Sequence, residues 1–204
     1  VMMFGFSAAM NENLAKLVDE LGQVRPTLLF AVPRVYNRIY EKLHLQIHNK
    51  SPKLYSLFQY GLTCSAKRRH GEKLSIKEAL AFKLCDKLFF SKVRARLGNR
   101  LRMAYSGGSA LNPAVIEFVQ NIGVTLLEAY GLTEAIVSAN SPDFQKTGAV
   151  GKPLPGVRVE IDRSVTMANE QDGEIIIYGA TMMLGYYNLP EETASVSTPE
   201  GGFR

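Results

Sequence analysis

Tyr130, Thr133 and Glu134 are the side chains whose types and spacing best suit chemistry in this sequence. They lie in the run 128–134, directly after the apolar and partly β-branched stretch 123–127. Such a stretch is typical of a buried strand, and ligands of open α/β sheets bind beyond the carboxyl ends of strands. The tyrosine ring can stack on a base, the hydroxyl can bond a phosphate oxygen and the carboxylate can bind Mg²⁺. These residues favour a nucleotide site at a strand end, with an ordinary polar turn as the alternative.

A second loop of suitable type is Ser106-Gly107-Gly108-Ser109. It follows a predicted strand at 101–105, and Asn112 and Pro113 are typical of a helix N-cap and first helical position. Gly123 would stop that helix before the next strand. A strand–loop–helix–strand unit predicts parallel pairing with a right-handed crossover. Both loops would then lie at one edge of the sheet and share one ligand.

The whole pattern predicts an α/β fold with a mostly parallel sheet, flanking helices and a smaller, mostly antiparallel β subdomain. Residues 1–147 would form the α/β subdomain with a helical insertion at about 44–93, and residues 148–204 the β-rich subdomain, truncated at its end. The predicted elements are a helix at 11–21, a strand at 27–32, a helix from Pro33, two helices within 51–96, a strand at 101–105, a helix from Pro113, and strands at 123–127, 157–161 and 174–178.

The insertion carries two local signals. Ser75 and Glu78 have the spacing of a capping box at the start of its second helix. The turn before that helix is basic and could touch anionic lipid, although a charge run is more often only a solvated surface. Its cations are Lys67, Arg68, Arg69 and Lys73.

Composition narrows the class of protein. The 204 residues are 46% hydrophobic, which suits a globular core and argues against disorder. Two cysteines suggest no disulfide framework, so a reducing intracellular setting is expected. No apolar run reaches the roughly 18 residues of a membrane span, and residues 1–10 lack a signal peptide's basic region. The net charge of +5 permits anionic partners without demanding nucleic acid.

Two patterns imitate known sites. His44 and His48 have the spacing of zinc ligands on a helix, but no third ligand is evident, which favours a packed or solvated pair. The run 148–153 imitates a phosphate loop. Lys146 stands where that loop needs its first glycine, and Pro153 replaces the Ser or Thr that would hold Mg²⁺, so a P-loop is rejected.

Taken together, the motifs resemble the adenylate-forming (AMP-binding) superfamily, and within it the long-chain fatty acyl-CoA synthetases, or ligases. The insertion at 44–93 resembles one typical of long-chain members. The matching segments, in family order, are 33–36, 106–111, 130–134, 148–156, and 173–175 with 185–188. The resemblance spans nearly the whole chain, and Tyr130-Gly131-Leu132-Thr133-Glu134 is its most diagnostic string.

The resemblance implies a role for each matched residue. Tyr130 would stack on adenine, and the two catalytic residues would be Thr133, which contacts phosphate, and Glu134, which holds Mg²⁺. The remaining implied site residues are Gly107, Gly108 and Ser109, whose backbone approaches adenine, and Ala129 and Gly131, which border the acyl channel.

The implied reaction has two steps. A fatty acid carboxylate and ATP give acyl-AMP and pyrophosphate, and the thiol of coenzyme A then displaces AMP. The implied cofactors are ATP, Mg²⁺ and coenzyme A, in a cytoplasmic protein, peripheral at the inner membrane face, with no nucleic acid partner. The alternatives are an aryl- or amino-acid-activating enzyme of the same superfamily, or a non-catalytic nucleotide- or lipid-binding module.

The sequence departs from the family pattern in one loop and lacks several of the family's segments. Ser109-Ala110 stands where the family usually has Ala-Pro, which bears on the stiffness of that loop. The family's triphosphate loop is expected before Val1, and its ribose-binding Thr-Gly-Asp and catalytic lysine after Arg204. The chain therefore resembles an internal fragment of the large N-terminal domain, and this fragment alone is predicted to be inactive.

Overall fold

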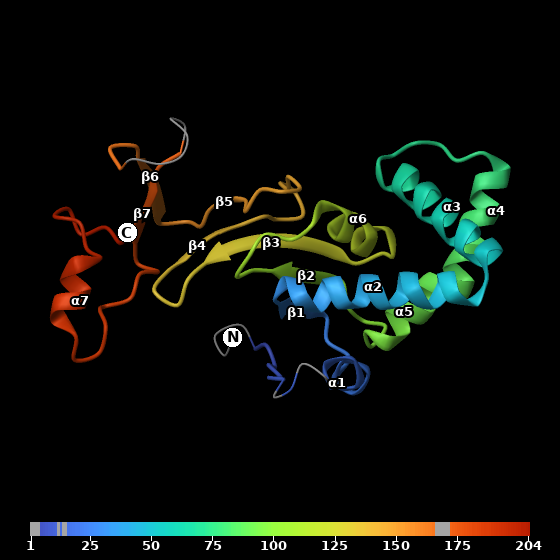
Figure 1. Ribbon diagram of the computed structural model, residues 1–204, viewed down its shortest axis with the longest axis horizontal. Coiled ribbons are helices and arrows are strands. Elements are labelled where there is room, and N and C mark those ends of the chain that lie inside the picture. The colour runs from blue at the N-terminus through green and yellow to red at the C-terminus, as the bar shows by residue number, and fades with distance from the viewer. Residues whose placement is uncertain (1–4, 12, 14–15, 166–171) are drawn as a thin grey trace. The chain divides into compact units, whose positions relative to one another are not determined.

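The computed structural model describes residues 5–11, 13, 16–165 and 172–204 (Figure 1). The chain forms two compact units, unit 1 up to Leu126 and unit 2 from Leu127 onward. The subdomain boundary between residues 147 and 148 stays a prediction. Among the described residues, no helix combines the length and the apolar character needed to cross a membrane.

Unit 1 contains two parallel strands and most of the helices. Strand β1 pairs with β2 in a register that runs from Leu28↔Met103 to Ala31↔Ser106. Helix α2 packs against α3 and α6, and α3 packs against α4. The elements are α1 (Leu17–Val24), β1 (Leu28–Ala31), α2 (Pro33–Lys50), α3 (Pro52–Arg69), α4 (Ile76–Cys85), the π-helical turn η2 (Asp86–Phe90), α5 (Ser91–Arg96), β2 (Met103–Ser106) and α6 (Pro113–Asn121).

The helices begin where local chemistry predicts. Pro33 occupies the first turn of α2, where a missing N–H costs nothing. The Ser75 hydroxyl accepts from the Glu78 amide while the Ser75 amide donates to the Glu78 carboxylate, so the predicted capping box is confirmed. The Asn112 side chain accepts from the amide of Ala114 at 2.9 Å, which confirms the predicted N-cap of α6.

A π-helical turn separates α4 from α5 and widens the buried face of this helical run. Phe90 at the end of the turn is fully buried, and Phe89 beside it packs against the same core. Helix α3 crosses this run at Gly61, where an added Cβ would lie 2.2 Å from the sulfur of Cys85. The glycine therefore permits a close approach that any larger residue would prevent.

Unit 2 is mostly antiparallel. Strand β3 begins at the end of unit 1 and continues into unit 2, where β3 pairs with β4 and β4 with β5. Strands β6 and β7 form a separate antiparallel pair, from Val157↔Gly179 to Asp162↔Glu174. The elements are β3 (Thr125–Gly131), β4 (Ile136–Ala139), β5 (Lys152–Pro153), β6 (Val157–Asp162), β7 (Glu174–Gly179) and α7 (Pro190–Ser195).

The predicted fold class is confirmed. The sheets are a five-stranded one, in the order β1-β2-β3-β4-β5, and the antiparallel pair β6-β7. Several element boundaries differ from the predictions, most of them by one to three residues. Helix α1 begins at Leu17, not at residue 11, and the region 51–96 holds a π turn between its later helices. The strand predicted at 123–127 extends to Gly131, because cross-strand pairing with β4 continues it.

Candidate functional site

The loop 107–109 follows β2 and exposes backbone rather than bulky side chains. Gly108 has φ of 89°, a conformation that favours glycine, although a Cβ there would find only Val32 Cγ1 at 4.0 Å. The backbone conformation, not crowding, therefore explains this glycine. Gly107 is half-buried, whereas Gly108 and Ser109 are exposed. The loop thus offers its amides and carbonyls to a ligand.

Ser106, the last residue of β2, has an unusual hydroxyl beside this loop. The residue is 2% exposed, and its Oγ has no hydrogen-bond partner among the described residues. A buried polar atom without a partner is costly, so a ligand or water that bonded it would be favoured. The preceding residue is fixed, because the Tyr36 hydroxyl donates to the Tyr105 carbonyl at 2.9 Å.

The end of β3 carries three of the predicted site residues in the strand itself. Ala129 pairs with Ala139 and Tyr130 with Ser138, and a register shift falls between Tyr130 and Gly131. The expectation that Tyr130 lies in a loop after the strand is therefore wrong. Its half-buried ring packs at the edge of the apolar cluster of unit 2.

A tight turn follows and presents Thr133 and Glu134. The Leu132 amide donates to the Ala135 carbonyl at 2.7 Å. A Cβ on Gly131 would approach that carbonyl oxygen to 3.2 Å, so glycine lets the turn close. Thr133 is exposed, and its hydroxyl makes no hydrogen bond among the described residues. This hydroxyl is therefore free to bond a ligand.

Glu134 is held at both its backbone and its side chain. Its carbonyl accepts from the Met183 amide at 2.6 Å, and its Oε1 accepts from the Tyr186 hydroxyl at 2.9 Å. This hydrogen bond, with burial and the charge of Glu134, raises the pKa of Tyr186. The other carboxylate oxygen has no partner in the described part of the chain. Tyr186 was placed in a family segment by the sequence, but its contact with Glu134 was not predicted.

The donor set at Glu134 fits Mg²⁺ in one particular way. Within residues 5–11, 13, 16–165 and 172–204, no three His, Cys, Asp or Glu side chains form a group that could hold a metal ion. Mg²⁺ commonly binds one or two carboxylates and takes its remaining ligands from substrate phosphates and water. A single oriented carboxylate with one free oxygen suits that arrangement.

The segment 140–151 is fixed by buried polar side chains that sequence reasoning missed. Glu128 Oε2 accepts from the Gly148 amide at 3.0 Å. Asn140 is 3% exposed, donates through Nδ2 to the carbonyls of Glu128 and Ala149, and accepts from the Lys146 amide at 3.1 Å. The carboxylate within the apolar run before Tyr130 was the available signal for Glu128, and nothing local marked Asn140.

The site residues are therefore divided between the two units. Gly107, Gly108 and Ser109 belong to unit 1. The residues of the β3 end and its turn belong to unit 2, where the structure brings Ala129, Tyr130, Gly131, Thr133 and Glu134 into one short segment. That both loops share one ligand stays a prediction.

Three cations of the predicted basic turn are instead in the last helical turn of α3, which runs to Arg69, and they are used internally. Lys67 forms an ion pair with Glu78 at 2.6 Å, Arg68 lies over the ring of Phe82, and Arg69 donates to the Gln120 side chain. The hydrogen bond from Lys67, with those from Ser75, lowers the pKa of Glu78 to about 2. These contacts give the turn a structural role.

His44 is a packed histidine, as expected. Its ring lies 4.1 Å from that of Tyr40 and 5.1 Å from that of Phe58, measured between centroids, and its Nδ1 lies 3.3 Å from the Tyr55 hydroxyl. Burial lowers the pKa of His44, which favours the neutral ring.

Comparisons with known proteins agree on one family. The family profile described as "AMP-binding enzyme" matches residues 1–187. The chain is 31% identical over 198 residues to long chain acyl-CoA synthetase 7, peroxisomal, of Arabidopsis thaliana, covering 93% of this chain and 27% of that protein. It is 29% identical over 199 residues to fatty acyl-CoA synthetase A of Dictyostelium discoideum, covering 93% and 29%. It is 30% identical over 197 residues to long-chain-fatty-acid–CoA ligase 6 of Rattus norvegicus, covering 93% and 27%.

Solved structures show the same fold. A malonyl-CoA ligase in a ternary product complex with methylmalonyl-CoA and AMP is 26% identical, with a TM-score of 0.55, over 94% of this chain and 32% of that one. The adenylation domain of a carboxylate reductase from Mycobacterium chelonae is 22% identical with a TM-score of 0.63, over 95% and 26%. The chain thus spans less than a third of the length of these relatives.

Proposed function

The chain belongs to the AMP-binding enzyme family, and on that premise we propose that it carries nucleotide- and acyl-binding loops of an ATP-dependent long-chain fatty acid–CoA ligase. The observation that carries the proposal is the turn after β3. There Thr133 keeps a free hydroxyl, and Glu134 is held by the Tyr186 hydroxyl with one carboxylate oxygen unoccupied. The names of the plant and rat relatives support a long-chain fatty acid as substrate.

The proposed reaction begins with attack of the fatty acid carboxylate on the α-phosphorus of ATP. The bond to the bridging oxygen breaks, pyrophosphate leaves and acyl-AMP forms. The thiol of coenzyme A then attacks the acyl carbon, loses its proton and displaces AMP. Negative charge grows on the α-phosphate in the first step, so fixed hydrogen-bond donors and nearby positive charge lower its barrier.

Each residue of the turn has a task in this scheme. The ring of Tyr130 stacks on adenine, with its edge on the apolar cluster of unit 2 as support. The Thr133 hydroxyl donates to a phosphate oxygen. Glu134 holds Mg²⁺, which when bound neutralises phosphate charge. Tyr186 acts as a positioning residue, because its hydroxyl fixes the orientation of the Glu134 carboxylate.

The remaining site residues act through backbone or small size. In the proposal, Gly107, Gly108 and Ser109 contact adenine through main-chain atoms, and Ala129 and Gly131 leave room for the acyl chain. The unpartnered Ser106 hydroxyl supports a polar ligand beside the glycine loop.

Two parts of the sequence interpretation remain hypotheses. Contact with an anionic membrane was assigned to the basic turn, and the internal contacts of Lys67, Arg68 and Arg69 do not support it. A cytoplasmic location likewise remains a hypothesis.

Pyrophosphate release by the intact protein tests the proposal. With ATP and coenzyme A, palmitate should be used in preference to malonate, benzoate or an amino acid. Preference for benzoate or an amino acid would instead favour another adenylate-forming enzyme, and no release with any acid would favour a non-catalytic binding module. Malonate is included because a malonyl-CoA ligase shares the fold.

Two substitutions locate the chemistry. Tyr130→Ala should weaken nucleotide binding by about 1–3 kcal/mol, the range for base–aromatic stacking, whereas Tyr130→Phe should retain it. Glu134→Gln should reduce Mg²⁺-dependent adenylation and leave the unfolding midpoint nearly unchanged, because the amide oxygen of glutamine can still accept from the Tyr186 hydroxyl. Full adenylation activity in Glu134→Gln would remove the metal role from this residue.

A further inference from the structure

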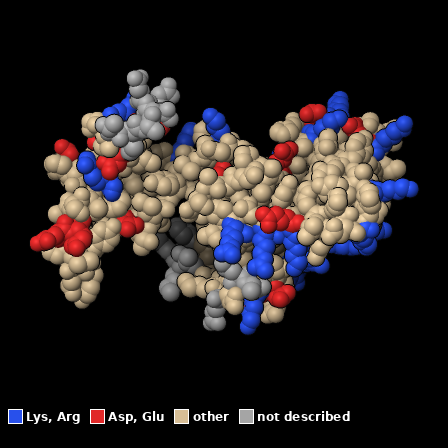
Figure 2. Space-filling view, viewed as in Figure 1, with Lys and Arg blue, Asp and Glu red and all other residues tan. Residues whose placement is uncertain are grey.

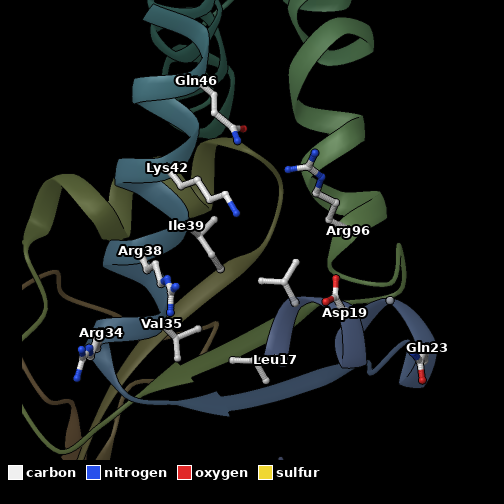
Figure 3. Close-up of a pocket in the computed structure, with 12 residues that line it drawn as sticks. Leu17, Asp19, Gln23, Arg34, Val35, Arg38, Ile39, Lys42, Gln46 and Arg96 are labelled. Atoms are coloured by element: carbon white, nitrogen blue, oxygen red, sulfur yellow. The ribbon is translucent and has the colours of Figure 1, made fainter. Parts of the chain in front are cut away.

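Helices α1, α2 and α5 of unit 1 border a hollow of about 880 Å³ that is separate from the glycine loop (Figure 3). Four cations line it. Arg34, Arg38 and Lys42 are four residues apart on α2 and therefore share one face, and Arg96 comes from α5. In the close-up, Lys42 and Arg96 extend toward one another from the two helices.

The charge of this hollow is not balanced from within. Asp19 is the one carboxylate among the described residues that line it, and these residues together have a net formal charge of +3. None of the four cations forms an ion pair or a hydrogen bond within the described residues. Elsewhere Lys67, Arg94, Arg158 and Arg204 each contact a carboxylate. Figure 2 shows Lys and Arg gathered along the face that carries α2.

Both the shape and the floor of the hollow distinguish it from a solvated surface. Cations on a single convex helix face point apart into water, whereas here Lys42 of α2 and Arg96 of α5 extend toward one another across a hollow. Like charges held close repel one another, and a bound anion relieves that repulsion. The volume falls in the range of small-molecule sites, and Leu17 and Val35 form a buried apolar floor beside Ile39.

We propose that this hollow binds a phosphate-bearing anion of at least two negative charges. Guanidinium groups match phosphate oxygens in a two-point geometry, and a lysine adds a mobile point charge. Arg38, Lys42 and Arg96 hold the phosphates, and an apolar portion of the ligand rests on Leu17 and Ile39. The site is additional to the adenylation residues, which lie on other segments of the chain.

Lysine reactivity tests the location directly. Lys42 is the lysine that the structure describes in the lining, and Lys73 and Lys77 are exposed lysines outside it. The intact protein is acetylated with and without tripolyphosphate, and each site is followed by mass spectrometry. Tripolyphosphate should slow acetylation of Lys42 several-fold and leave Lys73 and Lys77 unchanged. Equal slowing at all three lysines would show general screening and overturn the proposal.

A matched pair of double variants tests the strength of binding. Arg38→Gln with Lys42→Gln should weaken tripolyphosphate binding in calorimetry by at least about tenfold, because charge-assisted hydrogen bonds are lost. Lys73→Gln with Lys77→Gln removes the same charge and should leave binding unchanged. Equal affinity in both double variants would overturn the proposal, and tripolyphosphate bound at the nucleotide site would not protect Lys42.

The same footprint identifies the source of the phosphate. Protection of Lys42 by soluble tripolyphosphate supports a free phosphate compound. Protection only by phosphatidic acid vesicles assigns the site to a lipid headgroup of the same chemistry. Phosphatidylcholine vesicles, whose headgroup has no net charge, should protect nothing. Lack of protection by every probe would overturn the proposal.

Discussion

Units 1 and 2 hold their functional loops by different means. In unit 1, fully buried aromatic and aliphatic side chains such as Phe58 and Phe90 fill a single large cluster. In the described part of unit 2, the apolar cluster has four buried members, and Glu128, Ser138 and Asn140 are buried polar residues beside the site turn. Apolar packing supplies stability without direction, whereas hydrogen bonds fix the path of a loop.

The segment between β4 and β5 shows how closely hydrogen bonds and backbone contacts fix a loop in unit 2. The Ser138 hydroxyl donates to the Val150 carbonyl at 2.9 Å. Gly151 has φ of 84°, and a Cβ there would lie 2.1 Å from the backbone carbon of Ala139. Any other residue at 151 would push the loop away from β4.

The largest loss in the free energy of unfolding is expected when a buried aromatic ring is removed from unit 1. Phe58 is 0% exposed, with its centroid 5.4 Å from that of Phe89 and 5.1 Å from that of His44. Phe58→Ala should lower the free energy of unfolding by about 3–5 kcal/mol in urea denaturation, because it leaves a cavity. Leu45→Ala, at a position 62% exposed on α2, is the control and should change it little. Similar losses of unfolding free energy in both variants would show that buried apolar packing does not dominate the stability of unit 1.

A polar substitution should have a smaller but more local effect in unit 2. Asn140→Ala removes three side-chain hydrogen bonds and leaves the Ala149 carbonyl and the Lys146 amide unpaired. The expected loss is about 1–3 kcal/mol, with faster hydrogen exchange at the amides of Lys146 and Gly148. Asn49→Ala, at an exposed site on α2, serves as the control. Unchanged exchange at both amides would show that Asn140 does not order the loop.

Loss of the Tyr186 hydroxyl should have a still smaller effect on stability. Tyr186→Phe keeps the ring and releases the Glu134 carboxylate, so the required Mg²⁺ concentration for adenylation should rise. Because the hydrogen bond to Glu134 raises the pKa of Tyr186, its contribution is complete below the tyrosine's ordinary value of 10.0. It is lost as the pH rises through the folded-state pKa.

The stability difference between wild type and Tyr186→Phe should therefore be constant near neutral pH and shrink above about pH 10. The difference is measured from the urea midpoints of both proteins over a series of pH values. Tyr187→Phe, at a neighbouring residue 89% exposed, is the control. An unchanged Mg²⁺ requirement in Tyr186→Phe would show that Tyr186 does not position the Glu134 carboxylate for the metal.

The smallest effect is expected at the surface of unit 1. The pKa of Glu78 is lowered from 4.5 to about 2, first by Lys67 and then by Ser75. A lowered folded-state pKa stabilises the fold above the unfolded value and loses that contribution as the pH falls toward about 2. The urea midpoint of Glu78→Gln should lie below that of wild type at about pH 6, and the difference should narrow as the pH falls from about 4.5 toward about 2. A pH-independent difference would contradict this ion pair, and Glu72→Gln in the exposed turn is the control.

Local signals in the sequence predicted local structure well. A serine three residues before a glutamate sufficed for the capping box at Ser75, because all its atoms lie within one turn. The Asn112 cap followed for the same reason. The fold class could be predicted because apolar periodicity repeats along each element.

Interactions between distant residues could not be predicted in the same way. The partners of Arg68 and Arg69 are Phe82 and Gln120, so the basic turn was interpreted as a free surface. Strand β3 extends to Gly131 because of its pairing with β4, which no property of residues 128–131 reveals. Asn140 gains its role only when folding places it beside the Glu128 carbonyl.

The π turn at Asp86–Phe90 lets this helical run hold one more residue without changing its direction. A turn with i→i+5 bonds holds one residue more than an α-helical turn. The wider turn takes up that residue within itself, so α5 continues with nearly the rotational phase of an uninterrupted α-helix that is one residue shorter. Val93 therefore stays in the core, and Arg96 extends toward Lys42 across the hollow. The chain can thus carry one residue more at this point without changing the direction from which α5 brings a cation to the proposed anion.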